Sequence, residues 1–94
     1  MSQREVVIGS RIGLHARPAA MFVQAATACG LPVRISKVGG TKTVDARSIL
    51  SVLALGAKGG DTVLLEADGE GAEGALEELV SLLLRDLDSE TADA

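Results

Sequence analysis

Residues 13–20 read Gly13-Leu14-His15-Ala16-Arg17-Pro18-Ala19-Ala20, and this stretch predicts the passage from a loop into a helix. Proline fits the first turn of a helix, because its missing N–H costs nothing where backbone N–H groups have no intrahelical partner. The helix is therefore expected to begin at Ala16, with His15 just ahead of it and Arg17 in its first turn.

The start of this helix brings an imidazole, backbone N–H groups and a guanidinium together. The N–H groups and the helix dipole favour an anion, and Arg17 adds a fixed charge with forked donors. This set suits a phosphoryl group carried on a ring nitrogen. His15 is the only histidine and precedes the helix, so packing in the core explains it poorly. An exposed or capping histidine is the alternative, and it is the commoner case near a helix start.

Outward from this stretch, apolar periodicity and turn residues predict four strands and three helices in one small domain. The expected strands are 5–8, 33–37, 41–44 and 62–67, and the expected helices are 16–29, 49–55 and 72–87. The last helix is expected to pack on the core through Leu76, Leu79, Val80, Leu83, Leu84 and Leu87. The order β-α-β-β-α-β-α fits a two-layer α/β domain and leaves several strand arrangements open.

The helix 49–55 is short, and Ser48 is expected to cap its N-terminus. Apolar side chains surround most of its circumference, yet a short helix of a small domain cannot bury every side. We interpret Val52 and Leu55 as core residues. The residues expected in a partner-docking surface are Ala20, Ile49, Leu50 and Leu53. Simple core packing of the apolar residues in this helix is the alternative.

Charge is divided unevenly between the two halves of the chain. Residues 1–47 hold seven Lys or Arg against two acidic residues, whereas residues 48–94 hold two against eleven. The basic half carries His15 and suits acidic partner surfaces. A small nucleic-acid-binding domain is the alternative from another functional class. It is disfavoured because Phe22 is the only aromatic residue and the net charge is −4.

Nothing in the chain predicts membrane insertion or export. The longest nearly apolar run, 49–57, falls far short of the roughly 20 residues of a membrane span. Residues 1–5 lead directly into a strand pattern and lack the apolar core of a signal peptide. The single cysteine, Cys29, cannot form an internal disulfide and is expected to be a small packed or half-exposed thiol. We therefore expect a cytoplasmic protein.

Two motifs in order make the chain recognisable: Gly13–Ala19 and Ala46-Arg47-Ser48-Ile49-Leu50. The chain resembles the histidine-containing phosphocarrier family, HPr, of the bacterial phosphoenolpyruvate-dependent sugar phosphotransferase system. The resemblance covers residues 1 to 87 and predicts one domain over that range, followed by an acidic, disordered tail at 88–94. It implies an open-faced sandwich, in which a four-stranded antiparallel sheet carries three helices on one face.

The resemblance also implies roles for the first motif. His15 would accept a phosphoryl group on Nδ1 from phosphorylated enzyme I and pass it to a sugar-specific IIA protein or domain. Arg17 would stabilise the phosphoryl oxygens, with the amides of Ala16 and Arg17 as neutral donors. Such a protein is a covalent intermediate in a relay and not an enzyme with its own turnover. We expect a monomer that needs no cofactor and no metal.

Ser48 has two interpretations. As an N-cap it stabilises its helix by about 1 kcal/mol. By resemblance it matches the regulatory serine of Gram-positive members, which an ATP-dependent HPr kinase/phosphorylase modifies. Asp45 stands where many of those members have asparagine, and Arg47 where lysine is frequent. Both departures weaken the expectation of kinase recognition.

A mainly regulatory role is the alternative within the same fold. It would place the chain in a nitrogen- or dihydroxyacetone-related branch of the phosphotransferase network. Relatives devoted to regulation can lack the active histidine, so the presence of His15 favours the carrier.

Overall fold

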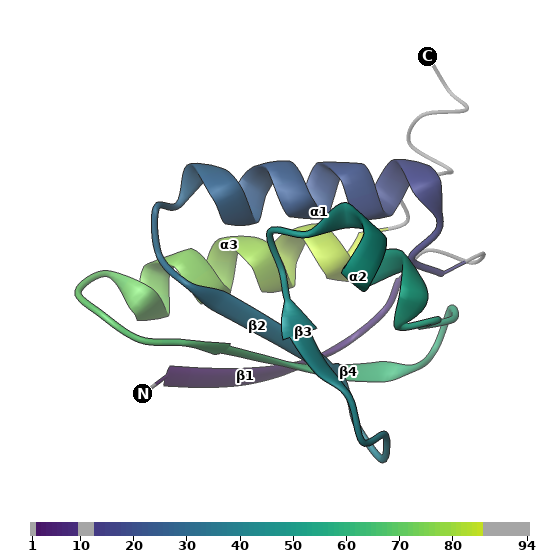
Figure 1. The fold of residues 1–94 in the computed structure, drawn as a ribbon. Coiled ribbons are helices and arrows are strands. Elements are labelled where there is room, and N and C mark those ends of the chain that lie inside the picture. The colour runs from purple at the N-terminus through teal and green to yellow at the C-terminus, as the bar shows by residue number, and fades with distance from the viewer. Residues whose placement is uncertain (1, 10–12, 86–94) are drawn as a thin grey trace.

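The computed structural model describes residues 2–9 and 13–85, which form a sheet covered on one face by helices (Figure 1). The strands and helices follow one another in the predicted order. In chain order the elements are β1 (Ser2–Val7), α1 (Ala16–Ala28), β2 (Val33–Lys37), β3 (Thr43–Asp45), α2 (Ile49–Ala54), β4 (Thr62–Ala67) and α3 (Ala72–Leu84). This is the open-faced sandwich that the resemblance implied.

The sheet has the strand order β1-β4-β2-β3, and every neighbouring pair is antiparallel. β4 lies inside the sheet because it pairs with both β1 and β2. Leu65 of β4, for example, stands opposite Arg4 of β1 and Ile35 of β2. Alternate residues of the strands face the helices. The buried strand residues are Val6, Val33, Ile35, Val63, Leu65 and Ala67.

Two long helices supply the other half of the core. α1 buries Pro18, Ala19, Phe22 and Ala26, and α3 buries Ala72, Leu76, Leu79 and Leu83. In contrast, α2 buries Val52 alone, while Leu55 just beyond it is half-buried against the core. The apolar stripe expected for α3 is thus largely confirmed.

The predicted core position of Leu84 is wrong, because 54% of this residue is exposed. Its helix ends at this residue, and the next residue, Arg85, has extended backbone angles. The expected continuation to residue 87 and the tail 88–94 fall, from residue 86 onward, outside the described residues.

Other boundaries shift by a few residues. β1 begins at Ser2 because it pairs with β4 along its whole length, out to Ala67. β3 begins at Thr43, where pairing with β2 starts at Ser36. α2 ends at Ala54 with Leu55 as its C-cap. These shifts leave the order and the packing unchanged.

Two exposed carboxylates accept backbone N–H groups in tight turns. Asp61 accepts the Lys58 N–H at 2.9 Å, and Asp45 accepts the Arg47 N–H at 2.9 Å. These backbone bonds are the main reason that the pKa of each carboxyl lies below its ordinary value of 3.8. Side-chain bonds from Lys37 to Asp61 and from Arg47 to Asp45 lower each pKa further.

The lowered pKa values predict a pH-dependent stability. The folded state binds these protons more weakly than the unfolded state, so the stabilisation is complete above about pH 4 and is lost as the pH falls through the folded pKa values. In an Asp45→Asn/Asp61→Asn double variant the amides still accept hydrogen bonds but do not titrate. Wild type is therefore expected to lose its advantage in unfolding free energy as the pH falls below about 4 and through the folded pKa values of Asp45 and Asp61. Urea unfolding at each pH measures this difference, and parallel profiles would contradict it.

Candidate functional site

His15 occupies the N-cap position of α1. Its backbone is extended, with φ −91° and ψ −167°. Its C=O accepts the first helical hydrogen bond, from the Ala19 N–H at 2.9 Å, and its own N–H donates to the Gly13 C=O at 3.0 Å. The residue is half-buried, and within the described part of the chain its imidazole makes no capping hydrogen bond to the helix. The structure therefore puts the imidazole at the end of a helix and outside the core.

The first turn of α1 presents donors at this end. The N–H groups of Ala16 and Arg17 precede the first intrahelical bond, and Pro18 has no N–H to present. Within this turn Arg17 is exposed, whereas Pro18 is buried. This turn, which is described in full, contains no acidic residue. The positive end of the helix dipole thus lies beside an imidazole and a guanidinium with no carboxylate in the same turn.

Two glycines hold the segment before His15 against the body of the protein. The Gly9 N–H donates to the Leu83 C=O at 2.8 Å, and a Cβ at Gly9 would collide with the Leu84 carbonyl oxygen. Gly13 has φ +96°, and a Cβ there would collide with the Ala57 carbonyl oxygen. Any larger residue would push the chain away at these two points. The backbone leading to His15 therefore depends on close approach at both glycines.

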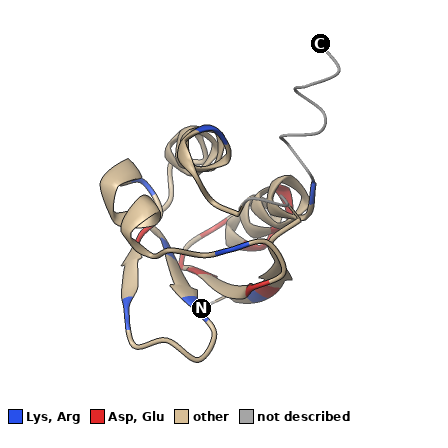
Figure 2. Cartoon of the chain, turned by 90° about the vertical axis from the view of Figure 1, so that its right-hand side faces the viewer, with Lys and Arg blue, Asp and Glu red and all other residues tan. Residues whose placement is uncertain are grey.

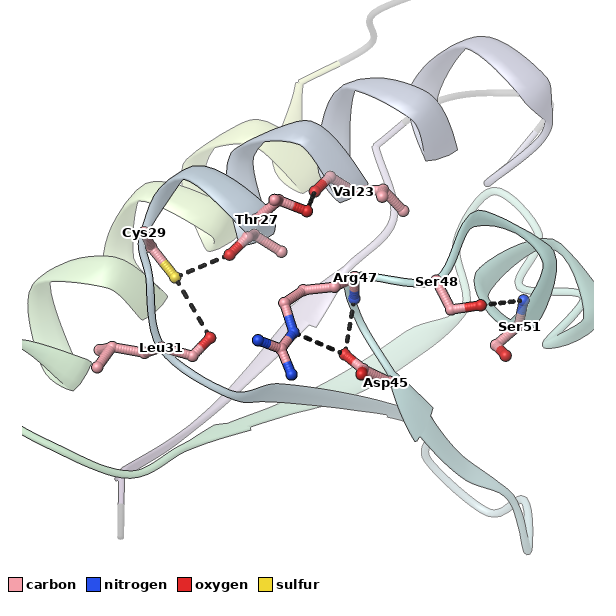
Figure 3. A network of polar contacts seen from close by, with 9 residues as sticks. Val23, Thr27, Cys29, Leu31, Asp45, Arg47, Ser48 and Ser51 are labelled. Carbon is pink, nitrogen blue, oxygen red and sulfur yellow. Dashed lines mark hydrogen bonds and ion pairs between the residues drawn. The ribbon is translucent and has the colours of Figure 1, made fainter.

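Ser48 caps α2, as the sequence predicted. Its Oγ accepts the Ser51 N–H at 3.4 Å (Figure 3). Its C=O accepts the Val52 N–H at 3.0 Å. Ahead of it, Asp45 Oδ1 binds both the backbone N–H of Arg47 and its Nε, the latter at 3.3 Å. The basic side chain next to Ser48 is thus engaged by the carboxylate three residues before that serine.

The predicted docking residues are only partly exposed. Leu50 presents 77% of its surface, the most of any large apolar residue in the described chain. Ile49 and Leu53 are half-buried and pack against the core, so they contribute to stability as well as to the surface. Ala20 on α1 is also half-buried. α1 and α2 contact each other, and α2 lies on the side of the molecule where α1 begins (Figure 1).

The two helices that carry the predicted docking residues, α1 and α2, are almost free of charged side chains. α1 and α2 contain no Asp or Glu, and Arg17 is their one charged residue. Acidic residues lie on α3 and on strands β1 and β4, and Asp45 lies on β3, where it is paired with Arg47 (Figure 2). The face that carries His15 and Leu50 therefore suits a negatively charged partner.

Other expectations concern metals, membranes and thiols. Over residues 2–9 and 13–85, no group of three or more His, Cys, Asp or Glu residues could hold a metal ion. In the same ranges no helix combines the length and the apolar character needed to cross a membrane. Cys29 is half-buried at the end of α1, where its thiol donates to the Ala26 C=O at 3.0 Å. This agrees with the expectation of a small packed or half-exposed thiol.

Sequence reasoning did not single out the turn 57–61, which contacts the segment before His15. The bonds of this turn to Ile8 and Leu14 depend on the strand order, which no local pattern contains.

Comparison with known proteins gives one consistent result. The family model described as "PTS HPr component phosphorylation site" matches residues 2–84. The phosphocarrier protein HPr of Streptomyces coelicolor is 52% identical over 88 residues, which cover 94% of each chain. The HPr-like protein Crh of Bacillus subtilis is 41% identical, over 86% of this chain and 93% of Crh. The crystal structure of HPr from Bacillus anthracis superposes with a TM-score of 0.80 at 38% identity, over 87% of this chain and 95% of that one.

Proposed function

Because the chain belongs to the HPr family of the phosphotransferase system, we propose that His15 carries the phosphoryl group and that Arg17 stabilises it. A protein of this family is a phosphocarrier in the relay and has no catalytic turnover of its own. Its partners are enzyme I, which supplies the phosphoryl group, and IIA proteins, which receive it.

One observation carries the assignment to His15. The imidazole stands at the N-cap of α1 without capping the helix, beside N–H groups that precede the first intrahelical bond. A ring nitrogen can attack phosphorus there while the bond between phosphorus and the donor breaks. The same N–H groups and the helix dipole then face the phosphoryl oxygens. The protein contributes alignment and charge, which are what a phosphoryl transfer chiefly requires.

Arg17 supplies the only formal positive charge on α1. Its exposure lets the guanidinium follow the phosphoryl group as it moves between partners, and its forked donors match two phosphoryl oxygens at once. Lysine would keep the charge and lose this fork.

The partners are proposed to dock on the face formed by α1 and α2. Leu50 is its most exposed apolar residue, and Ile49, Leu53 and Ala20 are half-buried around it. The absence of acidic residues from both helices favours acidic partner surfaces. Apolar contact at the centre with charge at the rim is the usual arrangement of a transient interface.

We also propose the remaining expectations as the working description of the protein. It is a cytoplasmic monomer with one domain over residues 1–87. The presence of His15 favours a phosphocarrier role over a mainly regulatory role in a nitrogen- or dihydroxyacetone-related branch. The similarity to Crh concerns the same fold and does not by itself assign regulation.

Replacing the imidazole tests the acceptor directly. In His15→Ala no phosphoryl group should be accepted when the protein is incubated with phosphoenolpyruvate and an enzyme I. Wild type should gain one phosphate that is stable in alkali and labile in acid. Intact-mass spectrometry measures both, and an acid-labile phosphate on any other residue would overturn the assignment.

Replacing the guanidinium tests the stabilising charge. Arg17→Ala is expected to slow transfer by about ten- to a hundredfold, because a charged donor to the transferring group is lost. Arg17 is exposed, so the unfolding free energy should hardly change. Arg17→Lys is the matched control and should lie between the two. Equal rates for all three proteins would refute the role.

Regulation through Ser48 is a second proposal. Its hydroxyl lies at the N-terminus of α2, where a phosphate is tolerated by the helix dipole, and two residues before the exposed Leu50. A negative charge there would oppose acidic partners on the docking face. HPr kinase/phosphorylase is the proposed modifying enzyme, although Asp45 engages the neighbouring Arg47.

A charge at Ser48 should therefore weaken docking. Ser48→Asp is expected to raise the KM for this protein in its reaction with enzyme I by about tenfold, as like charges meet across the interface. Ser48→Asn also caps a helix without adding charge and should behave as wild type. Unchanged transfer by Ser48→Asp would exclude an inhibitory role.

A further inference from the structure

The turn between α2 and β4 is closed from both ends by one residue. The Asp61 N–H donates to the Lys58 C=O at 2.9 Å, and the Asp61 carboxylate accepts the Lys58 N–H at 2.9 Å. Both polar groups of the Lys58 backbone are therefore tied to Asp61. This bonding fixes the orientation of the peptide group that joins Ala57 to Lys58.

The same turn holds both ends of the segment that precedes His15. At one end, the Ile8 N–H donates to the Asp61 C=O at 2.9 Å, and the Gly60 N–H donates to the Ile8 C=O at 3.0 Å. At the other end, the Leu14 N–H donates to the Ala57 C=O at 2.9 Å. Leu14 is buried and is followed directly by His15.

One peptide group connects these two observations. The C=O of Ala57 and the N–H of Lys58 belong to the same planar unit. Asp61 binds its N–H and Leu14 binds its C=O, so the carboxylate and the backbone before His15 lie on opposite ends of one rigid plane. Bonds in such a chain also polarise and strengthen one another.

We propose that Asp61 is a positioning residue for phosphoryl transfer. Its carboxylate orients the Ala57–Lys58 peptide, which in turn fixes Leu14 and thus the backbone from which the His15 imidazole projects. Asp61 touches neither the phosphoryl group nor a partner in this role. The inference rests on His15 being the acceptor, which the His15→Ala experiment decides separately.

The positioning role depends on the hydrogen bond that the Asp61 carboxylate accepts from the Lys58 N–H, and not on the charge of Asp61. Lys37 Nζ lies 3.4 Å from the Asp61 carboxylate, but both side chains are about one-third exposed. A pair of this kind contributes little to rigidity in water. The bond to the Lys58 N–H lies within the turn itself and needs only an oxygen acceptor, which asparagine also offers.

Three variants of the full chain separate these contributions: Asp61→Ala, Asp61→Asn and Lys37→Met. Initial rates are measured with phosphoenolpyruvate and enzyme I over a range of carrier concentrations. Asp61→Ala should lower the kcat of enzyme I with this carrier by about tenfold, because a small misplacement of the reacting group slows the transfer. KM should stay within about twofold, since the docking residues keep their places on α2. Asp61→Asn and Lys37→Met should retain the wild-type kcat.

Hydrogen exchange of the Leu14 amide supplies a readout that needs no phosphoryl transfer. Its protection should fall in Asp61→Ala and persist in the other two variants. The bonds between Ile8 and the turn are made by the backbone, so Asp61→Ala is expected to fold, and urea unfolding checks this. The proposal is overturned if kcat or Leu14 protection is unchanged in Asp61→Ala. It is equally overturned if Asp61→Asn is as slow as Asp61→Ala.

Discussion

β4 pairs with β1 on one side and with β2 on the other, and this shared pairing determines where the remaining parts of the protein can lie. It aligns the end of β1 with the turn before β4, so that the Ile8 N–H donates to the Asp61 C=O and the Ile8 C=O accepts the Gly60 N–H. The segment before His15 starts from this point. The helices then cover the buried face of the same strands, and the N-terminus of α1 is left at the edge of the core.

Local features of the chain were predictable because their causes are local. Pro18 and the apolar periodicity place the start of α1, and the hydroxyl of Ser48 places the start of α2. The pairing of β4 with β1 and with β2 was not predictable from the residues, because these strands are far apart in the sequence. Only the resemblance supplied that order. The exposure of Leu84 and the role of the 57–61 turn depend on tertiary contacts that no local pattern contains.

Three hollows on the described surface are lined by other residues than His15, around Pro32, Arg34 and Arg47 or around Lys37 and Leu55. A carrier has to offer its group to one protein and then to another, so the surfaces that enclose the group come from the partners. The half-buried Ile49 and Leu53 fit this arrangement, because a docking surface that is partly core is already rigid before the partner arrives.

The backbone of His15 is fully used, since its N–H binds the Gly13 C=O and its C=O binds the Ala19 N–H. With His15 as the proposed acceptor, these backbone bonds hold the start of the helix while the ring is loaded and unloaded. Successive partners of such a carrier then meet the same backbone at the start of α1.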